Sequence, residues 1–182
     1  MKNRQELIQA LSKYTSNFKE ETEFRKRFLS LLENVNAFQR THLPGHLTGS
    51  AWICNQDFSK VLLVHHAKLN RWLQPGGHAD GDENIIQVAL KETEEETGIN
   101  QYKIISESIF DLDIHRIPER KDMPAHDHYD IRILLQASDQ QKIIVSEESH
   151  DVKWLAMDEV KNFTDEQSVL RMVEKTKLLR TN

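Results

Sequence analysis

The sequence of 182 residues contains one cysteine, Cys54, and no apolar run near the roughly 20 residues that a membrane-spanning helix needs. A lone cysteine cannot form an internal disulfide, so the chain is expected in a reducing compartment. Residues 1–40 are rich in charge and lack the apolar core of a signal peptide. Internal repeats and low-complexity tracts are also missing. These absences predict a cytoplasmic protein without a membrane partner.

An excess of positive charge is missing too. Lysine and arginine together number 24 against 29 aspartates and glutamates, so the formal net charge is −5. This balance argues against a general nucleic-acid binder, and no stable nucleic-acid complex is expected. It is still compatible with a small nucleotide as substrate. The length fits one domain with a short extension, and it can bury a core without disulfides or structural metals.

The N-terminal part of the chain is predicted to be helical. Apolar residues recur there at helical spacing and indicate two helices. We interpret the stripes as packing surface, with a homodimer contact or a lid over a site as alternatives. The predicted organisation is an N-terminal helical extension, residues 1–40, packed on a domain of residues 41–182. The stripe residues are Leu7, Leu11, Tyr14, Phe18, Phe24, Phe28, Leu31, Leu32 and Val35.

The rest of the chain alternates between predicted strands and helices. A hairpin is expected from two strands, 51–54 and 61–65, and clean alternation predicts strands near 108–117 and 126–137. Further along come a short strand at 142–145, a strand running into a helix at 151–160, and a last helix from Thr164. Because this order has no regular βαβ rhythm, we predict an α+β fold with a mixed sheet and helices on both faces.

A helix is predicted from Asp80 to Gly98. Asp80 can cap its start, with Glu83 three residues later, and Gly98 suits the left-handed residue just past its end. Before it, the stretch "QPGGHADGD" is a glycine-rich loop whose backbone could approach a ligand closely.

Four glutamates crowd the last turns of this predicted helix. That end of a helix favours cations, so each carboxylate there costs about 0.3–1 kcal/mol. Three of them, Glu92, Glu95 and Glu96, are spaced so that they share one face. The cluster is either a solvated acidic face or a site for a hard divalent cation, which prefers several converging carboxylate oxygens. Glu94 points elsewhere.

The stretch from Gly77 to Ile99 resembles the Nudix box, the signature of the Nudix hydrolases. The signature has a glycine, then a glutamate after five residues, then after seven more Arg-Glu-hydrophobic-any-Glu-Glu-any-Gly-hydrophobic. Two positions depart from it: Lys91 stands in place of the arginine, and Thr93 in place of an apolar residue. The segments "VLLVHH", "WLQPGG" and "DVKWLAMDEV" also resemble the family.

The resemblance implies a Nudix-like α/β/α sandwich that hydrolyses a nucleoside diphosphate linked to another group, with Mg²⁺ or Mn²⁺. Glu95 and Glu96 would be metal ligands, and Glu92 a ligand or the base that deprotonates water. Gly77 would offer its carbonyl to a metal. Glu83 would steady the loop and helix through Lys91, although lysine lacks the planar fork of arginine.

Acids from outside the box often join such a site, and Glu147 and Glu148 are the candidates here, with ordinary surface acids as the alternative. The two departures keep open a Nudix-like nucleotide-binding or regulatory module without turnover. A metal-dependent isomerase on the same scaffold is a third hypothesis.

Substrate contacts are expected from the neighbouring aromatic and imidazole side chains. His78 follows Gly77 directly, and Trp72 could stack on a base or anchor the loop. On the 126–137 strand, His126, His128 and Asp130 share a face. They could bind a transition metal, bind phosphate oxygens, steady a glutamate, or form a polar face in water. The nucleoside diphosphate derivative itself is left open.

Overall fold

A computed structural model of the protein describes residues 1–120 and 123–180. The chain divides into two compact units. Unit 1 comprises Met1–Ser50, Gly77–Ala89 and Glu107–Ile133, and unit 2 comprises Ala51–Gly76, Leu90–Ser106 and Leu134–Asn182. Four elements pass from one unit into the other, because the boundaries fall inside β1, β4, α3 and β7.

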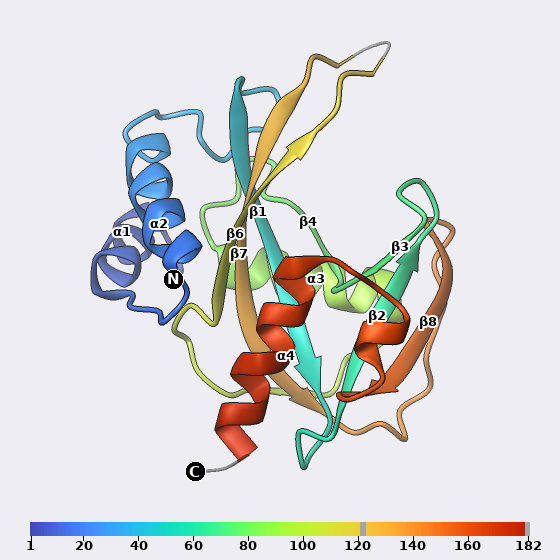
Figure 1. The fold of residues 1–182 in the computed structure, drawn as a ribbon. Helices are drawn as coiled ribbons and strands as arrows, with labels where there is room; N and C mark the ends of the chain where they lie inside the picture. The colour runs from blue at the N-terminus through green and yellow to red at the C-terminus, as the bar shows by residue number, and fades with distance from the viewer. Residues whose placement is uncertain (121–122, 181–182) are drawn as a thin grey trace. The chain divides into compact units, whose positions relative to one another are not determined.

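Two N-terminal helices confirm the helical prediction. Helix α1 (Arg4–Lys13) is capped by Asn3, whose side chain accepts a hydrogen bond from the Glu6 N–H. Helix α2 (Lys19–Leu31) lies beside it within unit 1 (Figure 1). Val35 was expected in the second apolar stripe, but its side chain is 79% exposed because the helix ends at Leu31.

The sheet has eight strands, and its main path runs β3-β2-β1-β7-β5. Off this path β4 pairs with β1, β6 with β7, and β8 with β2. Together with the helices this confirms the predicted α+β class with a mixed sheet. The strands are β1 (Gly45–Cys54), β2 (Lys60–His66), β3 (Arg71–Leu73), β4 (Gly76–His78), β5 (Tyr102–Ile104), β6 (Asp111–Ile117), β7 (His126–Ala137) and β8 (Ser149–Ala156).

Two strand predictions were wrong in detail. Strand β1 starts at Gly45, well before the predicted hairpin strand, and is buried along its whole length. Residues 142–145, all of which the structure describes, form no strand. Ile144 instead donates its N–H to the Thr97 carbonyl at 2.9 Å, so this segment covers the end of a helix.

That helix is α3 (Ile85–Thr97), which begins later than predicted. Asp80 has a left-handed backbone, with φ of 50°, and its carboxylate pairs with Arg40. Asn84 performs the capping role instead, because its side chain accepts the Gln87 N–H at 3.2 Å. Gly98 confirms the predicted end, with φ of 73°.

The C-terminal part of unit 2 contains a short 3₁₀ helix, η1 (Val160–Asn162), and helix α4 (Gln167–Arg180). Helix α4 starts three residues after the predicted Thr164. It is fixed to β1 by the Trp52 indole, which donates to the Thr176 hydroxyl at 2.8 Å. The side chains of Trp52 and Thr176 are both fully buried.

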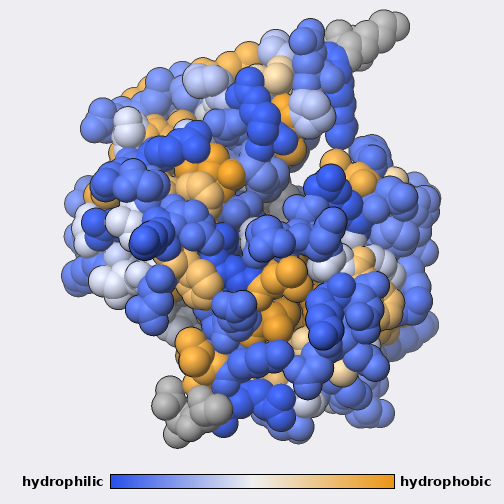
Figure 2. Space-filling model, viewed as in Figure 1, coloured by the Kyte–Doolittle hydropathy of each residue, from blue (hydrophilic) through white to orange (hydrophobic). Residues whose placement is uncertain are grey.

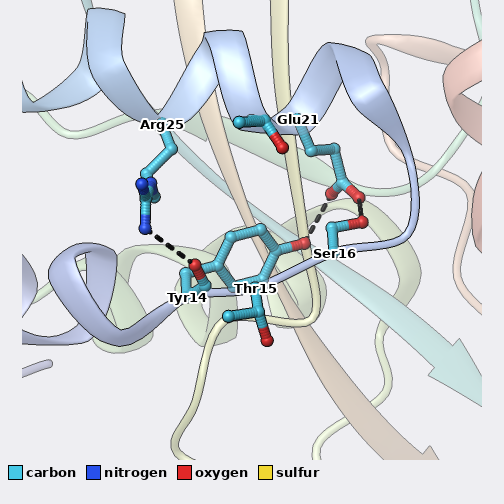
Figure 3. A pocket seen from close by; sticks show the side chains of 6 residues that line it. Tyr14, Thr15, Ser16, Glu21 and Arg25 are labelled. Atoms are coloured by element: carbon cyan, nitrogen blue, oxygen red, sulfur yellow. Dashed lines mark hydrogen bonds between the residues drawn. The ribbon is translucent and has the colours of Figure 1, made fainter.

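In unit 1 a pocket lies at the turn between α1 and α2, lined by Tyr14, Thr15, Ser16, Glu21, Thr22 and Arg25 (Figure 3). Several of its polar groups are hydrogen-bonded to one another, and Arg25 donates to the Tyr14 carbonyl at 3.2 Å. Glu21 is fully buried and accepts from the Tyr14 and Ser16 hydroxyls and from the Leu112 N–H at 2.9 Å. This carboxylate therefore ties α2 to β6 and to the turn.

The face shown in Figure 2 is mainly polar, and apolar side chains reach the surface there in places. Large apolar residues that are exposed include Val35, Ile144 and Leu178. Among residues 1–120 and 123–180, no helix combines the length and apolar character needed to cross a membrane.

Candidate active site

The acidic turn lies on the half of α3 that belongs to unit 2. Glu96 is 8% exposed, Glu92 is half-buried and Glu95 is exposed. The Gly76 N–H donates to the Glu96 carboxylate at 2.9 Å, so the loop before the helix fixes this side chain. Glu94 is exposed, as expected, and accepts from the Tyr102 hydroxyl at 3.2 Å.

The charge of Glu96 is unfavourable where it lies. Burial raises the pKa of its carboxyl to about 8, even though the Gly76 N–H lowers it. The negative charges of Glu92, Glu148 and Glu95 raise this pKa further. A divalent cation beside Glu96 would reverse this balance and favour the ionised form.

The donor set fits a hard divalent cation. Three carboxylates at i, i+3 and i+4 supply several anionic oxygens from one helix face. The most buried of them, Glu96, has a backbone donor on one oxygen, Oε2, which orients the group. Glu92, Glu95 and Glu96 are therefore the residues that could hold a divalent cation, which stays a prediction.

The expected link between Glu83 and Lys91 was wrong. Glu83 instead receives two hydrogen bonds from Arg4, one from its backbone N–H at 3.1 Å and one from Nε at 3.0 Å. Lys91 Nζ lies 3.5 Å from Oε2 of Glu95, which is one helical turn further along α3. Lysine is a point charge without a fork, and the exposed carboxylate one turn away is within its reach.

Arg4 also forms hydrogen bonds with residues other than Glu83. Its guanidinium donates to the carbonyls of Leu32, Asn34 and Val35, at 3.1, 2.7 and 2.7 Å. These carbonyls follow the C-terminus of α2. One side chain from α1 therefore holds the end of α2 and the first glutamate of the box.

Thr93, the second departure from the family pattern, fits into the packed interior. Thr93 is fully buried, and its carbonyl accepts from the Thr97 hydroxyl at 2.6 Å. Threonine therefore occupies the packing position that an apolar residue normally fills.

Of the two extra acids that were considered, Glu148 interacts with the acidic turn. Its charge is one of the causes that raise the pKa of Glu96. Both Glu147 and Glu148 are exposed, just before β8. An additional role for Glu148 stays a prediction that this electrostatic coupling supports.

Trp72 lies in β3 and packs against other side chains of unit 2. Its ring stacks on His65 with centroids 5.0 Å apart and an interplanar angle of 10°. Phe163 meets it edge-on at 5.6 Å, and the Lys153 ammonium lies 5.5 Å from its centroid. A role in stacking on a base stays a prediction.

The polar face of β7 does not lie in water. Asp130 is buried, and its carboxylate accepts three hydrogen bonds. The donors are the Thr48 hydroxyl at 3.0 Å, the Ser50 hydroxyl at 2.7 Å and Arg132 Nε at 2.7 Å. The predicted substrate contact of Asp130 was therefore wrong, because strand β1 covers it and protein donors engage its carboxylate. Its role is to join two strands.

Arg132, which the sequence did not single out, is the centre of this network. Its guanidinium also pairs with Asp111 at 3.0 Å and with Asp113 at 3.3 Å. Burial lowers the pKa of the Arg132 guanidinium, but the carboxylates of Asp113, Asp130 and Asp111 raise it, and the net effect is a raised pKa. The alternation of charges along the β6 and β7 sequences was the only local signal for it.

His78 and His128, both predicted to contact substrate, are brought together in unit 1. Their Nε2 atoms lie 3.2 Å apart, and His126 Nε2 lies 3.3 Å from His128 Nε2. His46 of β1 completes the group and was missed, because a lone histidine in a predicted loop carries no local signal. Burial lowers the pKa of His128 to about 2 and of His78 to about 4.

Residues 44–175 match the family model described as NUDIX domain. The asymmetrical bis(5'-nucleosyl)-tetraphosphatase of Rattus norvegicus is 30% identical over 106 residues, which cover 58% of this chain and 69% of that protein. A probable DHNTP pyrophosphohydrolase of Lactococcus lactis subsp. cremoris is 29% identical over 119 residues, 63% of this chain and 69% of that protein.

Solved structures show the same fold. The binary complex of a C. elegans Ap4A hydrolase has a TM-score of 0.60 at 19% identity, covering 74% of this chain and 97% of that one. A NUDIX family hydrolase from Clostridium perfringens has a TM-score of 0.56 at 25% identity, with the same two coverages.

Proposed function

We propose, from the premise that this chain belongs to the Nudix family, that it hydrolyses the diphosphate bond of a small nucleotide derivative with Mg²⁺ or Mn²⁺. The observation that carries the proposal is the arrangement around Glu96. A buried carboxylate, oriented by the Gly76 N–H, lies among other acids whose charges oppose its ionisation. Such a cluster is suited to a divalent cation and poorly suited to an empty protein interior.

Each residue has a distinct proposed role. Glu92, Glu95 and Glu96 would hold the cation, which when bound neutralises diphosphate oxygens and activates water. Glu92 is also the candidate to take the proton from the attacking water at a carboxylate oxygen. Glu148 is the candidate for an additional acid or base, since its charge reaches Glu96. The participation of the Gly77 carbonyl stays a prediction from the family pattern.

The rest of the proposal concerns the domain organisation, the cellular location and the choice of substrates to test. Residues 1–40 would form an extension of the Nudix domain, residues 41–182, which is supported by the contacts of Arg4 and Glu21 within unit 1. The single cysteine, Cys54, is free and buried, and supports a cytoplasmic location. The substrates named for the relatives place dinucleoside tetraphosphates and dihydroneopterin triphosphate first in a screen.

The test is hydrolysis by matched variants of the full chain. Wild type is screened with Mg²⁺ and Mn²⁺, first against dinucleoside tetraphosphates and dihydroneopterin triphosphate, and then against other dinucleotides, nucleoside triphosphates, nucleoside diphosphate sugars and capped RNA. Glu95→Gln and Glu96→Gln should each lower the rate by roughly 10²- to 10⁴-fold. Glu94→Gln is the matched control on the same helix turn, and it should keep wild-type activity.

Two outcomes would contradict the proposal. One is equal hydrolysis by wild type, Glu95→Gln and Glu96→Gln. The other is tight nucleotide binding by wild type with no turnover of any substrate in the screen, which would favour the non-catalytic module. Lys91 is the feature that favours that alternative, because it pairs with Glu95 in place of Glu83. Circular dichroism of each variant shows whether the fold is kept.

A further inference from the structure

Four histidines from three separate segments converge in unit 1. His46 belongs to β1, His78 to β4, and His126 and His128 to β7. One ring nitrogen of each of His46, His78 and His128 lies within 4.8 Å of those of the other two. His126 joins through its Nε2, 3.3 Å from His128 Nε2. Five of the ring pairs among the four have centroids 4.8–5.2 Å apart.

The hydrogen bonds of this cluster fix two of its tautomers. His126 Nδ1 lies 2.8 Å from the Pro124 carbonyl, and His46 Nδ1 lies 3.3 Å from the His42 carbonyl. A carbonyl oxygen can only accept, so each Nδ1 carries the proton. In a neutral ring the other nitrogen, Nε2, then presents a lone pair. Backbone carbonyls hold metal-binding histidines in this same way.

The lone pairs are short of partners. His46 is 1% exposed, and among the described residues its Nε2 is buried without a hydrogen-bond partner. His128 Nε2 faces the Nε2 atoms of both His78 and His126 and can supply at most one N–H to the two of them.

The kind of ligand that fits this cluster follows from these lone pairs. An anion such as phosphate needs N–H donors, and neutral nitrogens that present lone pairs repel it. A transition-metal cation accepts several imidazole lone pairs at once. Tetrahedral zinc, with bonds of about 2.0–2.1 Å, places its ligand nitrogens about 3.3–3.4 Å apart. The two Nε2 separations here are 3.2 and 3.3 Å.

We propose that His46, His78, His126 and His128 form a transition-metal site for an ion of the zinc class. The buried His46 and His126 are fixed by backbone carbonyls. The half-buried His78 and His128 make the small ring adjustments that bring all four nitrogens to bonding distance and give the ion a route from solvent. The site joins β1, β4 and β7, and its nitrogen donors set it apart from the carboxylates of α3.

The test uses metal-free full-length protein. Calorimetric titration with Zn²⁺ should show one tight equivalent that excess Mg²⁺ does not displace, and Co²⁺ should give the visible absorption of tetrahedral coordination. His46→Gln and His128→Gln should each weaken the binding by about 100-fold, at least as much as loss of a supporting residue does. His150→Gln is the matched control, because His150 is an exposed histidine of β8 outside the cluster.

Several results would overturn the site. They are the absence of stoichiometric Zn²⁺ binding by wild type, equal binding by His128→Gln and wild type, and inorganic phosphate binding to the metal-free protein that His128→Gln removes. If His46→Gln fails to fold, His126→Gln provides the same comparison. The inference does not depend on hydrolysis: zinc binding is measured without substrate, and Glu95→Gln should keep it in full.

Discussion

Replacement of Arg132 by methionine should destabilise the protein strongly. Arg132 is 2% exposed and is shared by Asp111, Asp113 and Asp130, with its shortest contact, 2.7 Å, to Asp130. Methionine keeps much of the side-chain volume but removes the positive charge. The carboxylates would then lie buried beside one another without their common cation, which is the situation in which a broken ion pair is most harmful.

The magnitude follows from that geometry. Removing one partner of a buried ion pair costs about 3–5 kcal/mol. For a protein of this size, each kcal/mol lowers the melting temperature by roughly 2–4 °C, so Arg132→Met should melt about 6–20 °C below wild type. Arg116→Met is the control, because Arg116 pairs with Asp127 at the surface, where Arg27 also contacts that carboxylate. It should change stability by less than about 1 kcal/mol.

The assay is thermal and urea unfolding of both variants, followed by circular dichroism. A second substitution separates charge from packing. Asp111→Asn should destabilise wild type, but it should be neutral or stabilising in the Arg132→Met background, because it removes one uncompensated charge. If Arg132→Met melts within 2 °C of wild type, or if the two substitutions are simply additive, the network does not stabilise the fold as we argue.

Two other predictions concern the end of α3 and the single cysteine. Gly98→Ala should lower the free energy of unfolding by about 1–2 kcal/mol or more, because φ is 73° and a Cβ would lie 2.7 Å from Ile144 Cγ1; an unchanged urea midpoint would contradict this. Burial raises the pKa of the Cys54 thiol to about 12, so a thiol reagent at pH 8 should label the native protein far more slowly than the urea-unfolded chain. Equal rates in the two states would show that the thiol is accessible.

Local patterns in the sequence were sufficient for the features that depend on neighbouring residues. The spacing of Glu92, Glu95 and Glu96 placed them on one helix face, and Gly98 marked its end, because both follow from helix geometry alone. The predicted start of α3 at Asp80 was wrong, because Asp80 and Asn84 are both good N-cap residues. The choice of Asn84 depends on the loop conformation, in which Asp80 turns toward Arg40.

Contacts between distant segments could not be predicted. Alternating aspartates on β6 and β7 were compatible with water on one face, and only the pairing of these strands shows that they surround Arg132. The histidine cluster has the same character. His126 and His128 share a face by strand geometry, but nothing local indicates that His46 and His78 join them.

The position of Arg4 changes where this Nudix domain should be considered to begin. The family match starts at residue 44, yet Glu83, the seventh residue of the box, is held from α1 by Arg4. A shortened chain that starts at Thr41 would keep the whole signature while exposing Glu83 and the β6 backbone that Glu21 covers. We therefore expect residues 1–40 to stabilise the folded domain, and comparisons of this protein with relatives that lack these residues should be made on a chain that retains them.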